Sequence, residues 1–86
     1  MPACPAEIMM DGAPAALQAA REALAGGGGS LDLAPLRRFD SSAVAVLVAL
    51  RREAGSGAAF RNPPPNLRKL ASLYGVEAAL FGPPTP

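Results

Sequence analysis

The sequence predicts a small α/β domain, because short apolar segments alternate along it with longer stretches of helical spacing. Segments 31–33 and 58–61 have the length and apolar content of strands. Segments 14–25, 41–54 and 65–74 repeat apolar side chains every three or four residues, as helices do. This alternation favours an α/β layer fold.

Length and composition limit the chain to one domain. With 86 residues, half of them hydrophobic, it is too apolar to be disordered and too short to bury a large core. We expect a disordered N-terminus over residues 1–5, a single domain over residues 6–81 and a loose tail over residues 82–86.

Charge, cysteine content and hydropathy exclude several classes of protein. The net charge is +1 and the basic residues are scattered, so nucleic acid is not an expected partner. The single cysteine cannot form a disulfide within the chain, which fits a reducing compartment. The chain does not begin like a secretory signal, and its longest apolar run, residues 43–50, is far short of the ~20 residues of a spanning helix. We expect a cytoplasmic protein that does not insert into a membrane.

The first third of the chain predicts a strand and then a helix. Residues 6–10 alternate weakly and indicate a short strand. Pro14 lies where a helix tolerates proline best, in its first turn, and we expect a helix over residues 14–25. Its predicted inner face consists of Ala13, Leu17, Ala20, Arg21 and Leu24.

The glycine run at residues 26–30 is interpreted as a flexible linker. A phosphate-binding loop needs Gly-Lys-Ser/Thr leading into a helix, whereas this run follows a helix and has no lysine near it. We therefore expect no nucleotide binding.

The second strand, residues 31–33, should be central and parallel, since a helix precedes it and another follows. After the helix at 41–54, Gly55, Ser56 and Gly57 should end that helix, and residues 58–61 should form a further strand.

The proline-rich segment 62–66 can only be a turn. It leads into the predicted helix 65–74, followed by one more turn over residues 76–81 with Leu80 and Phe81 folded back onto the core. The predicted buried side of the helix consists of Leu67, Leu70, Ala71 and Tyr74. We interpret Tyr74 as a core residue whose hydroxyl reaches water.

The helix at 41–54 organises the rest of the chain. An acid and two hydroxyls, Asp40, Ser41 and Ser42, stand where capping groups are preferred, and Arg51 and Arg52 complement the dipole at its end. Helical spacing places one apolar stripe toward the core. This stripe consists of Ala43, Val46, Leu47 and Leu50.

The other face of this helix is flat and almost uncharged, whereas an ordinary surface helix carries charges there. We therefore predict that this face binds a partner. The predicted partner-binding residues are Ser41, Ser42, Ala45, Val48, Ala49 and Arg52.

Two segments carry a resemblance to a known family. Leu31-Asp32-Leu33, then Phe39-Asp40-Ser41-Ser42 and the apolar helix, resembles the STAS domain, the fold of the anti-anti-sigma factors. Residues 66–76, NLRKLASLYGV, are similar to the ending of the MlaB-type STAS subunit of the bacterial phospholipid-transporting ABC complex. The resemblance spans roughly residues 6–81 and implies a small mixed sheet with helices packed on it.

The chain departs from the family at three places. Members usually carry one more strand before the one predicted at 6–10, so the sheet is expected to be N-terminally truncated, with an unpaired edge. The isolated chain should then be marginally stable or form a homodimer. Ala43 stands where anti-anti-sigma members have glycine, and the connector 55–57 is short.

The sequence offers little for catalysis. It has no histidine and no cysteine cluster, so we expect no metal and no cofactor. Asp32 and Asp40 are not expected to converge as an acid/base pair, and Ser41 and Ser42 have no base near them in sequence. A non-catalytic binding protein is the expected class.

Three interpretations of Asp40, Ser41 and Ser42 remain open. They can act as a helix cap alone. The resemblance to anti-anti-sigma factors implies phosphorylation of Ser42 by a serine kinase, which would switch an antagonist of an anti-sigma factor. The resemblance to the transporter subunit implies that Ser41 lies at the contact with the ATPase subunit.

The Leu-Tyr-Gly-Val segment at residues 73–76 and Ala43 favour the transporter type. On that interpretation the chain is a regulatory or assembly subunit of an ABC transporter that maintains outer-membrane lipid asymmetry. Its partner would hold it at the inner face of the inner membrane.

Overall fold

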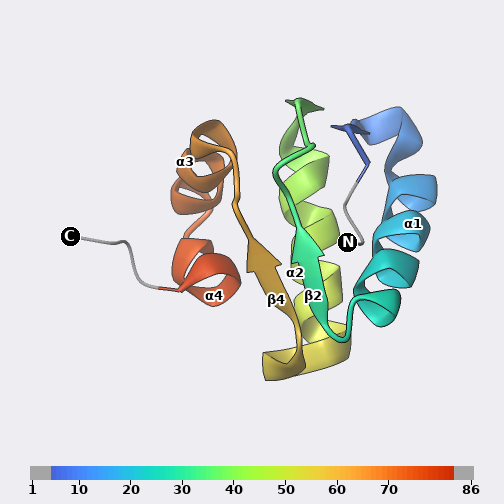
Figure 1. The fold of residues 1–86 in the computed structure, drawn as a ribbon. Helices are drawn as coiled ribbons and strands as arrows, with labels where there is room; N and C mark the ends of the chain where they lie inside the picture. The colour runs from blue at the N-terminus through green and yellow to red at the C-terminus, as the bar shows by residue number, and fades with distance from the viewer. Residues whose placement is uncertain (1–4, 83–86) are drawn as a thin grey trace.

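The computed structural model describes residues 5–82 of the chain (Figure 1). Most of the expected disordered N-terminus and loose C-terminal tail falls on residues 1–4 and 83–86, which lie outside the described residues. The elements, in chain order, are β1 (Glu7–Ile8), η1 (Met10–Gly12), α1 (Ala13–Gly26), β2 (Ser30–Asp32), β3 (Arg38–Phe39), α2 (Ser41–Ala54), η2 (Gly55–Gly57), β4 (Ala59–Arg61), α3 (Pro65–Leu73) and α4 (Glu77–Phe81). The predicted α/β class is confirmed, and α2 begins and ends at the predicted residues.

The strands form two parallel pairs. β2 pairs with β4, with Leu31 opposite Phe60, and β1 pairs with β3, with Ile8 opposite Phe39. The sequence predicted one small mixed sheet with residues 31–33 at its centre, whereas in the described part of the chain β2 pairs only with β4. The reason lies after β2, where Leu36 N–H donates to the Leu33 carbonyl at 3.0 Å and turns the chain away before β3.

The core lies between the β2–β4 pair and α2. Helix α2 covers one face of this pair, with α1 on one flank and α3 and α4 on the other (Figure 1). The predicted stripe of α2 is confirmed: Ala43, Val46, Leu47 and Leu50 are all at most 4% exposed. The other large, fully buried side chains are Ile8, Leu31, Leu33 and Leu67.

Helix α1 packs on α2 by a face slightly rotated from the predicted one. Ala20 and Leu24 are buried as expected, but Ala16 is buried too, while Leu17 is only half-buried. Arg21 reaches out to Glu53 of α2 in a two-bonded ion pair with N···O distances of 2.9 and 2.7 Å. Helical spacing alone does not fix the rotation, which here follows from the close approach that alanine permits.

The glycine run is an ordered turn, so the predicted flexible linker is wrong. Gly26 is the last residue of α1, and Gly29 N–H donates to the Leu24 carbonyl at 2.9 Å. Gly29 has φ +94°, and a β-carbon there would collide with the carbonyl oxygen of Gly57. Glycine is therefore required at position 29 by both its backbone conformation and its contact with Gly57.

Tyr74 was predicted in the core, and this is wrong, because its side chain is 58% exposed. Helix α3 ends at Leu73, and the chain reverses at Gly75, whose φ is +73°. Val76 N–H then donates to the Ala71 carbonyl at 2.9 Å, which closes the helix end and leaves Tyr74 outside the turn. The predicted further turn is confirmed as α4, with Leu80 buried and Phe81 packed against the core.

Arg51 fastens the C-terminal elements to α2. Its guanidinium donates to the carbonyls of Gly55 at 2.7 Å, Ala79 at 3.0 Å and Leu80 at 3.1 Å, and also to that of Ala58. It lies 5.0 Å from the centre of the Phe60 ring, within range of a cation–π contact. One side chain thus satisfies carbonyls of η2, of the segment before β4 and of α4.

We expect Arg51→Gln to lower the free energy of unfolding by about 1–3 kcal/mol, because the half-buried hydrogen bonds to the Ala58 and Leu80 carbonyls lose their charged donor. Arg52→Gln, one residue on and exposed, is the matched control and should change it by no more than about 0.5 kcal/mol. Urea denaturation followed by circular dichroism measures both. Equal effects of the two substitutions would show that Arg51 does not hold α4.

Candidate functional site

The first turn of α2 is fixed by the carboxylate of Asp40. One oxygen accepts a hydrogen bond from Ser42 N–H at 2.8 Å, which is the predicted helix cap. The other oxygen accepts one from Met10 N–H at 3.0 Å. The second bond joins η1 to the start of α2 across thirty residues of sequence. The sequence gives no indication of this second bond, because its donor is a backbone N–H group, which every residue except proline carries.

These bonds stabilise the charged form of Asp40. The hydrogen bond from Ser42 N–H is the largest cause that holds the pKa of this carboxyl below its ordinary value of 3.8, and the bond from Met10 adds to it. Asp32 has a separate role at the turn after β2, where it accepts from Ala34 N–H at 3.0 Å and from the Asn62 amide at 3.1 Å. The two carboxylates therefore stabilise different turns, Asp40 at the start of α2 and Asp32 after β2.

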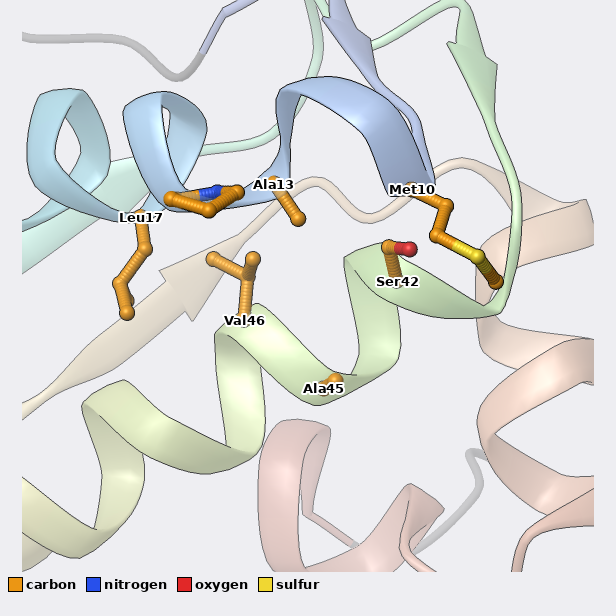
Figure 2. A pocket seen from close by; sticks show the side chains of 7 residues that line it. Met10, Ala13, Leu17, Ser42, Ala45 and Val46 are labelled. Atoms are coloured by element: carbon orange, nitrogen blue, oxygen red, sulfur yellow. The ribbon is translucent and has the colours of Figure 1, made fainter.

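The predicted partner-binding residues of α2 do not all face outward. Ala45 and Arg52 are exposed, and Ser41, Val48 and Ala49 are half-buried on the outer side of the helix. Ser42 is only 9% exposed and is turned toward η1 (Figure 2). Its backbone N–H donates to Asp40, and its side chain also interacts with that carboxylate and helps to lower the Asp40 pKa.

A first groove runs between α2 and the segment from η1 to α1. It has a volume of about 340 Å³, and Figure 2 shows Met10 and Leu17 above it and Ala45 on α2 below. Met10 is 71% exposed, although the Asp40 bond fixes its backbone. The residues that line the groove are Met10, Ala13, Pro14, Leu17, Ser42, Ala45 and Val46.

A second groove lies on the opposite side of α2, toward the junction of α3 and α4. Its volume is about 440 Å³, and its residues are Ser41, Val44, Ala45, Val48, Tyr74 and Val76. Ala45 lines both grooves, so it forms a low ridge between them. We call the outer side of α2 together with these two grooves the α2 docking surface.

The α2 docking surface is apolar and has no charge in either groove lining. Two exposed large side chains contribute to the linings of its grooves, Met10 to the first and Tyr74 to the second. Methionine and aromatic side chains are enriched at protein–protein interfaces, and such exposed clusters mark binding surfaces more often than scattered single residues do. The arrangement suits the docking of an apolar surface of another protein.

The sequence located the α2 part of this surface and missed its two rims. Ser41, Ala45 and Val48 were found from helical spacing, whereas Met10 and Tyr74 enter only through the η1 and Gly75 turns. Tyr74 carried one usable signal, since a residue that directly precedes a helix-ending glycine lies at the turn and not on the packed face.

Within residues 5–82 no three acidic, histidine or cysteine side chains are close enough to hold a metal ion. In the same range no helix is both long and apolar enough to span a bilayer.

The comparisons with known proteins give one match. Residues 6–82 match the family model described as "Mlab, STAS domain". No curated protein matches the chain, and no solved structure matches it. The matched region contains all the elements that form the α2 docking surface.

We expect Asp40→Asn to destabilise the protein near neutral pH, because an amide has a single acceptor oxygen for the two N–H groups of Met10 and Ser42. The pKa of Asp40 is lower in the folded than in the unfolded protein. Ionised Asp40 therefore adds to the free energy of unfolding above the unfolded pKa of about 4, and this contribution is lost as pH falls through the folded pKa. Urea unfolding at a series of pH values should show the wild type and variant converging in acid. Asp11→Asn, an exposed site in η1, is the control. A difference that persists unchanged into acid would contradict the assigned role.

Proposed function

The chain belongs to the MlaB-type STAS domain family, and from this premise we propose that it is a non-catalytic subunit that binds the ATPase of a phospholipid-transporting ABC complex. The observation that carries the proposal is the α2 docking surface, where an exposed alanine separates two apolar grooves. A partner can approach the helix closely at Ala45 and place side chains into the groove on either side.

The proposed mechanism is conformational. Helix α2 is held on its inner side by the core, at its start by Asp40 and at its end by Arg51, so it presents its outer side as a rigid surface. A rigid subunit shifts its partner's equilibrium only if it binds one state of that partner more tightly. We propose that it favours the assembled or active state of the ATPase, on the cytoplasmic side of the inner membrane.

The alternative function is an antagonist of an anti-sigma factor, switched by phosphorylation of Ser42. A kinase would have to reach a side chain that is 9% exposed, at the first turn of α2. The phosphate would then lie close to the Asp40 carboxylate that accepts the Ser42 N–H, and the two charges would repel each other. These features weigh in favour of the transporter proposal.

Ala45→Glu should leave folding nearly unchanged and abolish co-purification with the ATPase subunit. Ala45 is exposed in the free protein, but a docked partner would bury the new charge without a counter-charge, at a cost of several kcal/mol. The matched control is Ala19→Glu, at an exposed alanine of α1 outside both grooves. Leu47→Ala should show the opposite pattern, a loss of about 2–5 kcal/mol of stability from a core cavity.

Co-expression with a tagged ATPase, together with thermal melts of each variant, measures these effects. If Ala45→Glu folds and still co-purifies as well as Ala19→Glu, the docking surface lies elsewhere on the molecule.

Ser42→Ala distinguishes the two candidate functions. The backbone bond from residue 42 to Asp40 remains, so we expect a folded protein that retains ATPase binding and supports the envelope barrier of the cell. The signalling function instead requires this variant to be locked in one regulatory state. A constitutive regulatory phenotype of Ser42→Ala, with normal barrier function in cells that lack the protein, would favour the anti-sigma interpretation.

A further inference from the structure

A hollow of about 360 Å³ lies away from the α2 docking surface, between β3 and the first turn of α3. Its lining residues are Met9, Arg37, Arg38, Phe39 and Asn66. The lining of this hollow thus combines two arginines and one amide with two apolar side chains. The proposed function does not use this hollow.

The two guanidinium groups are incompletely neutralised. Arg38 forms an ion pair with Glu7 at 3.4 Å, but both side chains are more than half exposed, so water screens the pair. Arg37 is exposed, and its side chain has no hydrogen bond or ion pair to any other described residue. Of the two arginines, only Arg38 thus has a carboxylate partner among the described residues.

The backbone that carries these arginines is fixed. The N–H groups of Arg37 and Arg38 both donate to the carbonyl of Ala6, at 2.8 and 3.1 Å. The adjacent β3 pairs with β1 in parallel register. The backbone that carries both guanidinium groups is thus already ordered before an anion binds. This lowers the entropic cost of binding.

We propose that this hollow binds a phosphate group. The guanidinium donors of Arg37 and Arg38 match the spacing of phosphate oxygens, and the Asn66 amide supplies a neutral donor. Met9 and Phe39 complete the lining of the hollow. The phosphate can belong to a small soluble anion or to a phospholipid headgroup, since both present the same oxygens.

The hollow shares no lining residue with either groove of the α2 docking surface. Met9 lines the hollow and Met10, the next residue, lines the first groove, so the chain separates the two sites. Phosphate binding and ATPase binding are therefore separately testable, and the failure of one leaves the other standing.

The test is an NMR titration of the full chain with inorganic phosphate, compared with sodium chloride at equal ionic strength. We expect the amide signals of Arg37, Arg38 and Asn66 to shift with phosphate and to stay in place with chloride. Arg37→Gln should weaken phosphate binding by about ten-fold or more, the loss of one charged hydrogen-bond donor. Arg61→Gln removes an equal charge from β4, outside the hollow, and should bind phosphate like the wild type.

Vesicle flotation distinguishes the two sources of phosphate. Binding to vesicles that contain phosphatidic acid, lost in Arg37→Gln and absent with pure phosphatidylcholine, would identify a lipid headgroup. Phosphate shifts without vesicle binding would identify a soluble anion. Equal shifts with chloride, or unchanged phosphate affinity in both Arg37→Gln and Asn66→Ala, would overturn the proposal.

Discussion

The structure depends most on the carboxylate of Asp40, which accepts one hydrogen bond from Ser42 and another from Met10, thirty residues before it in the sequence. One bond begins α2, and the other holds η1 against that beginning. The second bond fixes the backbone of Met10 beside the first groove. A single acceptor group therefore couples the start of the central helix to the shape of the surface beside it.

Helix α2 has two sides with different tasks. Its inner side fills the core with aliphatic side chains, while its outer side carries small ones and leaves Ala45 exposed between two grooves. The small side chains contribute little to the stability of the free protein. What they permit is the close approach of another protein to the backbone of α2. On the proposed function, stability and partner binding depend on opposite faces of one helix, so the proposed substitutions should separate the two.

The sequence predicted what depends on neighbouring residues and missed what depends on distant ones. The bounds and inner stripe of α2 follow from local caps and helical spacing, and both were predicted. The contacts of Arg51 with α4 and the position of Met10 follow from groups elsewhere in the chain. The glycine run was misread for the same reason, since Gly29 is required by its contact with Gly57. The exposure of Tyr74 is an exception, because it follows from the turn at the neighbouring Gly75.

The central claim is that a partner covers the α2 docking surface. The signals of two adjacent methionines provide a direct test of it. Met10 lines the first groove, whereas Met9 lines the hollow beyond it. In protein labelled with ¹³C at the methionine methyl groups, addition of the ATPase subunit should shift or broaden the Met10 signal and leave the Met9 signal in place. A complex in which the Met9 signal changes and the Met10 signal does not would contradict the account.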